Sequence, residues 1–349
     1  MRRKGGKGSA AVVRVRSCGI VGIFTTRSQA ALELYEGLLM VQHRGQDSAG
    51  IVSYDGNRFR ERKDRGLVKD VFDKESMAYL EGTTAMGHVR YPTAGGDTGA
   101  DAQPFFVNSP LGLYLIHNGN LTNCGPLRNL LEHQSDLSFF RHLRTDSDSE
   151  VLLNVLADNV RPLLSSLSRV SPAANPLPPP RLQIHRAHKL LSTASAHDLV
   201  FQAARQTMND ITGAYSVITM VNQVGLFAFR DPHGIRPLVL GHRLNEDGED
   251  EWAFASEDAA LAPIGFERVR DVRPGEALLV TTEGELKTDQ CVPGKLNPCI
   301  FEYIYLARPD STINDIPVYE FQLNLGTARE WFPSPGHVIW LHGQSFTPC

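Results

Sequence analysis

A single cysteine, Cys18, stands directly before a short apolar run in the stretch RVRSCGIVGIF, residues 14–24. The run Ile20 to Phe24 is typical of a buried strand, so the thiol is expected at a strand end. A cysteine held in such a place can act as a nucleophile when its surroundings favour the thiolate. Cys18 is therefore the first candidate for chemistry, and the alternative is an inert buried thiol.

Three polar clusters lie next to other predicted strands: QHRGQDSAG at 42–50, GHVRYPTAGG at 87–96 and HNGNLTN at 117–123. The second and third clusters are expected where a strand stops, and rigid strand ends commonly position the loop residues of a site. Gly, Asn and Asp also satisfy ordinary turns, so each cluster alone is compatible with a purely structural role.

A fourth cluster, TDSDSE at 145–150, precedes a helical pattern. Ser147 and Glu150 have the spacing of a capping box, and Asp148 would complement the helix dipole. By itself this pattern favours a helix start over a binding site.

Mixed α and β elements are expected to carry these clusters. Apolar residues at helical spacing predict helices at 30–42 and 148–157. A hairpin is expected over 275–287, turning at Gly284. The Pro- and Ser-rich stretch 161–197 breaks both periodicities, which predicts an exposed insertion. Strand-like runs lie at 19–24, 84–89, 113–117, 214–220 and 224–229.

Size and composition indicate a globular protein. The 349 residues, 42% of them hydrophobic, are enough to bury a substantial core. No apolar run approaches the roughly 18 residues that cross a bilayer, and no secretory signal is recognised, so we expect no membrane association and a cytoplasmic location. The five cysteines are scattered without zinc-ligand spacing, which favours a reduced compartment and predicts no metal site.

Charge is unevenly distributed along the chain. Segment 1–17 holds six basic side chains and no acidic one, which leaves 29 basic against 39 acidic side chains in the rest. The acidic body argues against nucleic acid as a partner, because phosphate contacts need clustered Lys and Arg. The basic segment is expected to be a disordered or removed extension, and its composition also resembles that of a transit peptide.

In this order, CGIVGIF, QHRGQDSAG, GHVRYPTAGG, HNGNLTN and DSDSEVLL resemble the glutamine amidotransferases whose nucleophile is an N-terminal cysteine. The later motifs FRDPHGIRPLVLG, ASEDAAL and FEYIYLARPDS narrow the resemblance to the amidophosphoribosyltransferases, which open purine biosynthesis. The likeness runs from Cys18 to about Gly326, apart from the Pro-rich stretch. It implies an α+β fold of the N-terminal-nucleophile hydrolase type, a four-layer αββα sandwich with two antiparallel sheets between helical layers.

The resemblance also implies a catalytic apparatus. In that family the thiol attacks the side-chain amide of L-glutamine, forming a glutamyl thioester and releasing ammonia. Cys18 would be the nucleophile. Asn118 and the Gly119 backbone N–H would form the oxyanion hole.

The same resemblance assigns the glutamine-binding residues. Arg90 suits the substrate α-carboxylate, because a guanidinium can grip it with two hydrogen bonds. Asp148 suits the α-ammonium, so a residue at a helix start would also be a ligand. Arg44 and Thr93 would be supporting members of the substrate site.

The resemblance divides the chain into a glutamine amidotransferase domain, 18–305, and the start of a connection to a second domain, 306–349. In the family, the second domain binds phosphoribosyl pyrophosphate (PRPP) with Mg²⁺ and forms 5-phosphoribosylamine. Its phosphate loop has no counterpart here, since the nearest text, ALLVTTEGE, lacks the paired acids. We therefore expect no cofactor in this chain, Mg²⁺ and PRPP only with the second domain, and no 5-phosphoribosylamine from the chain alone.

The tail 327–349 departs from the family pattern, which favours a shortened or misread gene product. Some family members hold an iron–sulfur cluster, and Cys299 lies near one ligand position, but the other ligands are not found and no cluster is expected. A homo-oligomer is compatible with the resemblance.

Two other functions remain open at this point. One is a non-catalytic, glutaminase-like module that binds glutamine or a partner subunit without turnover. The other is a different hydrolase of the same class, against which Arg90 and Asp148 argue. A condition applies to activity, because the family nucleophile uses its own α-amine as general base. Activity is therefore expected only once Cys18 is the first residue. Either translation starts so that removal of Met exposes Cys18, which we favour, or residues 1–17 are cut off between Ser17 and Cys18.

Overall fold

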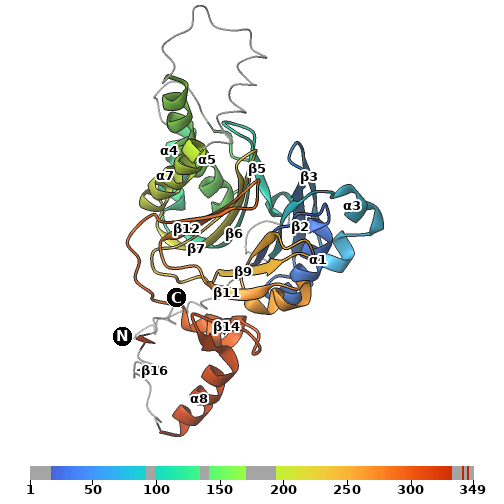
Figure 1. Ribbon diagram of the computed structural model, residues 1–349. Coiled ribbons are helices and arrows are strands. Elements are labelled where there is room, and N and C mark those ends of the chain that lie inside the picture. The colour runs from blue at the N-terminus through green and yellow to red at the C-terminus, as the bar shows by residue number, and fades with distance from the viewer. Residues whose placement is uncertain are drawn as a thin grey trace, which may run out of the picture.

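The computed structural model describes residues 17–91, 99–133, 141–169, 194–331, 340–341 and 344–345. Two antiparallel sheets face each other between helical layers, so the fold is the αββα sandwich that the family resemblance implies (Figure 1). The basic segment is described only from Ser17 onward. The expected disorder or removal of residues 1–16 and the expected exposure of residues 170–193 in the Pro-rich stretch therefore lie outside the described residues.

The seven-stranded sheet has the order β11-β9-β10-β1-β4-β2-β3. Its central strand β1 is buried along its whole length, with Val21 opposite Gly87 of β4 and Ala255 of β10. Burial on both faces explains the continuous apolar run that predicted this strand. The strands are β1 (Gly19–Phe24), β2 (Ser48–Tyr54), β3 (Phe59–Arg65), β4 (Thr84–Arg90), β9 (Val239–Leu244), β10 (Asp250–Ala255) and β11 (Glu267–Asp271).

The six-stranded sheet has the order β13-β12-β8-β7-β6-β5. The predicted hairpin is confirmed, with Gly284 at its turn in the left-handed region (φ +86°). The predicted strand end at His117 is wrong, because β6 stays paired with β7 as far as Leu121 opposite Gly213. The strands are β5 (Phe105–Val107), β6 (Leu113–Leu121), β7 (Gly213–Val221), β8 (Gly225–Arg230), β12 (Glu276–Thr281) and β13 (Leu286–Gln290).

Helices cover the outer face of each sheet. Helix α1 packs on the seven-stranded sheet through Leu34 and Leu38, whereas α5 and α7 cover the six-stranded sheet. The helices and helical turns are α1 (Ala30–Met40), η1 (Gln42–Arg44), α2 (Val68–Val71), α3 (Lys74–Tyr79), η2 (Gly99–Asp101), α4 (Cys124–His133), α5 (Asp148–Arg169), α7 (Ala194–Asp210), η3 (Asp258–Ala260), η4 (Ala262–Ile264), η5 (Glu302–Leu306) and α8 (Val318–Trp331).

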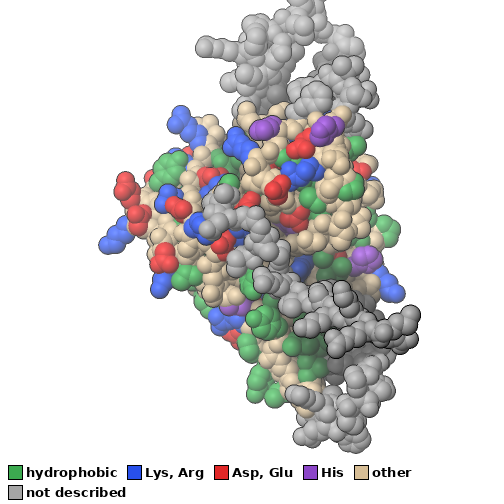
Figure 2. All heavy atoms as spheres, turned by 180° about the vertical axis from the view of Figure 1, so that it is seen from behind, with side chains coloured by type: hydrophobic (Ala, Val, Ile, Leu, Met, Phe, Trp, Pro, Cys, Tyr) green, Lys and Arg blue, Asp and Glu red, His purple; other side chains and the backbone are tan. Residues whose placement is uncertain are grey.

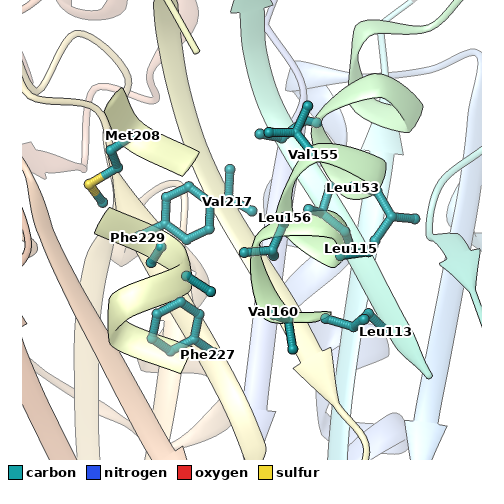
Figure 3. Close-up of a cluster of buried hydrophobic side chains, with 14 of the residues drawn as sticks. Leu113, Leu115, Leu153, Val155, Leu156, Val160, Met208, Val217, Phe227 and Phe229 are labelled. Atoms are coloured by element: carbon teal, nitrogen blue, oxygen red, sulfur yellow. The ribbon is translucent and has the colours of Figure 1, made fainter. Parts of the chain in front are cut away.

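Three apolar layers hold the sandwich together. In the outer layer of Figure 3, Leu153 and Leu156 of α5 pack over Leu115 of β6, near the Phe side chains of β8. Between the sheets, a Cβ added to Gly22 of β1 would lie 3.0 Å from Ile218 Cγ2 of β7. This contact shows how closely the nucleophile strand packs on the second sheet.

Two sequence predictions around α5 need correction. The helix continues to Arg169, and α7 begins at Ala194, so the ends of the expected insertion 161–197 are helical. The expected capping box is also wrong in detail. Ser147 Oγ accepts from the Ser149 N–H (3.3 Å), but the Glu150 carboxylate turns back to the N–H groups of Arg144 and Thr145. Those loop N–H groups need partners as much as the helix end does.

A small C-terminal unit follows the sandwich. It contains η5, the short strands β14 (Thr312–Ile313) and β15 (Ile316–Pro317), and α8, around a core that includes Tyr303 and Phe321. Hydrophobic side chains gather over this lower part of the molecule in Figure 2, and its exposed apolar residues are Ile304, Tyr305, Tyr319 and Leu323. The short strands β16 (Trp340–Leu341) and β17 (Gln344–Ser345) complete the described tail. None of the helices in the described ranges is long and apolar enough to cross a membrane.

Candidate active site

Cys18 lies immediately before β1 and is partly exposed. The strand approaches its neighbours closely here, since a Cβ on Gly19 would lie 2.7 Å from Val89 Cγ2 and 2.8 Å from Val41 Cγ2. A glycine next to the cysteine therefore allows the central strand to fit between β4 and α1. The consequence is a thiol fixed at the end of the most constrained strand of the sheet.

The surroundings of the Cys18 thiol act on its pKa in opposite directions. Burial raises this pKa above its ordinary value, and the negative charge of Asp148 adds to the increase. A hydrogen bond with the Tyr91 backbone and the positive charges of Arg236 and Arg90 oppose it. The thiol therefore lies within electrostatic reach of both side chains to which the resemblance assigns the glutamine head group.

Asn118 reaches Cys18 from the other sheet. Its Oδ1 accepts a hydrogen bond from the Cys18 backbone N–H (3.1 Å), and the residue is fully buried. Its Nδ2 has no hydrogen-bond partner among the described residues. A buried amide donor without a partner costs free energy unless a ligand supplies an acceptor. The geometry therefore gives Asn118 a donor for an oxygen bound beside Cys18.

Gly119 follows on the same strand, opposite Tyr215 of β7. A Cβ at this position would lie 2.0 Å from the Ala214 carbonyl oxygen and 2.5 Å from His117 Nε2. No side chain can be accommodated without moving the backbone of β7. The residue type is thus required by packing, and the oxyanion role of its N–H stays a prediction.

Arg90 ends β4 and is almost fully buried. Its Nη1 donates to Asp47 Oδ2 (2.7 Å) and its Nη2 to Asp101 Oδ2 (3.1 Å). A guanidinium carries five N–H donors in a rigid fork, and these two aspartates fix its plane. The expected binding of the substrate α-carboxylate by Arg90 stays a prediction.

Asp148 begins α5 and ties it to β6. Its Oδ2 accepts from the Leu121 N–H (2.9 Å), and its Oδ1 lies 3.9 Å from His117 Nδ1. The side chain remains partly exposed, so a positively charged ligand group can reach it. Arg90 and Asp148 therefore present opposite charges to the space near the thiol, as a zwitterionic amino acid requires.

Arg44 is placed differently from a substrate ligand. Its side chain is fully buried, with Nε donating to the Cys18 carbonyl oxygen (3.2 Å) and Nη2 to Ser17 Oγ (2.8 Å). Its remaining contacts are with the carboxylates of Glu257 and Glu302. Arg44 thus holds the Cys18 backbone, and its expected role as a supporting member of the substrate site stays a prediction. Thr93, the other expected supporting residue, lies outside the described residues.

The carboxylate of Glu257 is the centre of the polar contacts behind Arg44. Burial would raise its pKa, but Arg44, His43 and the Arg308 N–H lower it to about 2. Ser311 Oγ donates to the same carboxylate (2.8 Å). The motifs ASEDAAL and FEYIYLARPDS, used above only to recognise the family, thus meet at the back of the nucleophile.

Arg236 and Glu302 were not identified as site residues from the sequence. Arg236 Nη1 donates to Glu302 Oε1 (2.8 Å), and the Arg236 charge acts on the Cys18 thiol. The turn that carries Arg236 wraps around the buried carboxylate of Asp231, which accepts from the N–H groups of Ile235 and Arg236. Their positions in two family motifs were the available signal, but the motifs do not state what each residue contacts.

The described residues contain no group of three His, Cys, Asp or Glu side chains that could hold a metal ion. The side chains near Cys18 instead supply a thiol, an amide donor and fixed charges of both signs. This combination suits covalent attack on the amide of a charged amino acid.

Comparisons with known proteins agree with this geometry. The chain is similar to amidophosphoribosyltransferase from Pasteurella multocida (strain Pm70), with 48% identity over 322 residues that cover 90% of this chain and 57% of the relative. The Haemophilus influenzae (strain ATCC 51907 / DSM 11121 / KW20 / Rd) protein of the same name is 46% identical, with the same coverage. No family model matches the chain.

A solved structure is also similar over most of the chain. It is the glutamine PRPP amidotransferase from B. subtilis complexed with ADP and GMP, with a TM-score of 0.69 and 29% identity. The match covers 92% of this chain and 59% of that chain. The chain therefore spans a little over half the length of these relatives, and it belongs to the amidophosphoribosyltransferase family, of whose members it represents the N-terminal portion.

Proposed function

We propose that this chain is the glutamine-hydrolysing part of an amidophosphoribosyltransferase. The observation that carries the proposal is the Nδ2 of Asn118, which is buried and has no partner among the described residues, on a side chain bonded to the backbone of a partly exposed Cys18. A buried amide donor held in this way supports attack of the thiol on a carbonyl group. The names of the relatives support glutamine as the source of that carbonyl.

In the proposed reaction the thiol forms the covalent bond to the substrate, and the fixed hydrogen-bond donors stabilise the charge that develops. The Cys18 sulfur attacks the side-chain carbonyl carbon of glutamine, and the Asn118 amide stabilises the negative oxygen that forms. The amide nitrogen takes up a proton and leaves as ammonia, which gives a glutamyl thioester. Water then cleaves the thioester to glutamate and restores the thiol, so no oxidant or metal enters the balance.

In the whole family protein, we propose that the ammonia is used with PRPP to form 5-phosphoribosylamine, glutamate and diphosphate. We propose that Mg²⁺ acts only in that second step, with the domain that binds PRPP. A homo-oligomer and a cytoplasmic location are part of the same proposal.

A glutamate-release assay on protein that begins at Cys18 tests the function, with isothermal titration calorimetry as the measurement of glutamine binding. Release of glutamate and ammonia in equal amounts is expected. If the protein binds glutamine but releases no glutamate, it is a glutamine-binding module and not an enzyme. A protein that neither binds nor hydrolyses glutamine would overturn the proposal.

Arg90→Ala and Asp148→Asn are each expected to raise the KM for glutamine about 10- to 100-fold and to change kcat much less. Each removes hydrogen bonds to a charged group of the substrate, worth roughly 1.5–3 kcal/mol. These contacts are present in the ground state as well as in the transition state, so mainly binding suffers. Asp148→Asn keeps an oxygen for the Leu121 N–H while it removes the negative charge and replaces the other oxygen by an NH₂ group.

Arg141→Ala is a matched control for Arg90→Ala. Arg141 is similarly buried and pairs with Asp158 through Nε (3.1 Å) and Nη2 (2.7 Å), away from the thiol. Its loss should leave the KM unchanged. If Arg141→Ala raises the KM as much as Arg90→Ala, the effect is one of stability and the assignment of Arg90 fails.

Asn118→Ala is expected to lower kcat about 100-fold with a small effect on the KM. The removed donor acts on the oxygen only as it becomes negative, which is the behaviour of an oxyanion-hole residue. Asn154→Ala is the control, because Asn154 is a buried asparagine whose Nδ2 donates within α5. Equal kcat values for Asn118→Ala and the parent protein would contradict the oxyanion role.

A further inference from the structure

Glu302 occupies a position between two arginines at the back of the nucleophile. It is 1% exposed, and its two carboxylate oxygens accept from Arg44 Nη2 (2.6 Å) and from Arg236 Nη1 (2.8 Å). It lies in η5, far along the chain from both arginines and from Cys18. A buried carboxylate placed between two cations fixes the distance between them, because each oxygen is committed to a different guanidinium.

Both arginines act on Cys18, but on different parts of it. Arg44 Nε donates to the Cys18 carbonyl oxygen (3.2 Å) and so fixes the backbone. Arg236 supplies a positive charge that acts on the thiol. Glu302 therefore connects the group that holds the nucleophile's backbone with the group that influences its ionisation.

We propose that Glu302 is a positioning residue for the Cys18 nucleophile, because its carboxylate holds Arg44 on the Cys18 backbone and Arg236 beside the thiol. The inference rests on the proposed glutaminase function for its meaning in catalysis. It adds a role for the FEYIYLARPDS segment, which reaches the site from the C-terminal unit rather than from the sandwich.

The ion pairs of Arg44 and Arg236 determine how the loss of the Glu302 charge affects the Cys18 thiol. Arg44 pairs with Glu257 as well as with Glu302, and Arg236 also pairs with Glu302. Loss of the Glu302 charge leaves the Arg236 charge less compensated beside the thiol. More positive charge favours the thiolate, so the thiol should ionise at lower pH.

Other charged groups face the thiol and must stay constant in the experiment. They are Arg90 at the end of β4 and Asp148 at the start of α5, in addition to Arg236 in the turn after β8. Neither Arg90 nor Asp148 is hydrogen-bonded to Glu302 in the described contacts. A change at Glu302 therefore reaches the thiol through Arg236 and Arg44.

The test is the pH dependence of Cys18 alkylation by iodoacetamide in the full 349-residue chain. The Cys18 peptide is quantified by mass spectrometry, which separates it from the other cysteines. Glu302→Gln is expected to lower the alkylation midpoint by roughly half a pH unit or more. Arg236→Gln is expected to raise it, and Glu302→Asp to bring it back toward the parent value.

Glu251→Gln is the matched control. Glu251 is a buried glutamate that pairs with Arg243 and accepts from the Thr26 N–H, beyond the opposite end of β1 from Cys18. Its loss should leave the Cys18 midpoint unchanged. In glutamate release by protein that begins at Cys18, Glu302→Gln should lower kcat about tenfold and affect the KM less.

Several results would overturn the proposal. One is a folded Glu302→Gln protein, checked by circular dichroism, with the midpoint of the parent; another is an equal shift in Glu251→Gln. If Glu302→Gln does not fold, an Arg236→Gln protein with the alkylation midpoint of the parent would also overturn the proposal. Alkylation of Cys18 does not require turnover of glutamine. If the midpoints shift as expected but no glutamate is released, the proposed glutaminase function is wrong and the positioning role of Glu302 is still supported.

Discussion

Replacing Cys18 by alanine is expected to abolish glutamate release, with a loss of at least about 10,000-fold. The thiol forms the covalent bond to the substrate, and none of the other contacts at the site can supply that step. The measurement is made on protein that begins at residue 18, so that the chain end and its α-amine are the same in both forms. Glutamine binding should persist, because Arg90, Asp148 and Asn118 are unchanged.

Cys124→Ala controls for the loss of a thiol. Cys124 is also partly exposed and reduced, and it begins α4, but it has no place in the proposed reaction. The parent rate is expected for this variant. If the Cys18→Ala protein releases glutamate at the rate of the parent protein, Cys18 is not the nucleophile and the proposed thioester does not form.

The second large effect concerns the bond between Ser17 and Cys18. Protein that carries residues 1–17 uncut is expected to release glutamate at least about 100-fold more slowly than protein that begins at Cys18, since a general base is typically worth 100- to 10,000-fold. A free α-amine with a pKa of about 7.7–8.0 has a basic lone pair at neutral pH. The nitrogen of Cys18 in the uncut chain is a peptide N–H, and it donates to Asn118 Oδ1.

The structure adds a steric reason for the same result. Ser17 is 2% exposed, and its Oγ accepts from Arg44 beside the nucleophile. The preceding residue is thus packed into the site rather than held away from it. Removing it opens space at the Cys18 nitrogen and leaves Arg44 with its two glutamates.

The pH dependence of the two forms should differ as well. In the form that begins at Cys18, kcat/KM should rise with pH through the α-amine pKa, because only the neutral amine accepts a proton. The uncut form has no such group at the site and should lack that limb of the profile. Both masses are verified before assay, and equal activity of the uncut form would show that a free α-amine is not required.

Local patterns predicted the centre of the seven-stranded sheet and most of the six-stranded sheet. The strands at 19–24 and 84–89 and the helix at 30–42 were placed within one or two residues of β1, β4 and α1. Their apolar residues pack on one core, so their spacing records the fold directly. The strand at 113–117 was predicted too short, because polar residues such as His117 are also accepted inside a sheet when the backbone ladder continues.

The polar back of the site was not predicted. Arg44 lies more than 200 residues before both Glu257 and Glu302 in sequence, and each of the three alone resembles an ordinary surface charge. A buried ion pair leaves no periodic signal, since its free energy depends on partners brought together only by the fold. The resemblance supplied the residues around the thiol, and the structure adds the protein groups that these residues contact.

The central position of β1 has a consequence for how the chain is made. This strand precedes every other described strand, yet its two neighbours are β4 and β10, so its second edge stays unpaired until residue 255 has been synthesised. The ion pair between Arg44 and Glu302 can form only later, after residue 302 has been synthesised. An unpaired strand edge in a growing chain invites pairing with other chains, which is a reason for nascent proteins to need chaperones. Among the described strands, β1 is thus the first to be synthesised and one of the last to be paired on both edges.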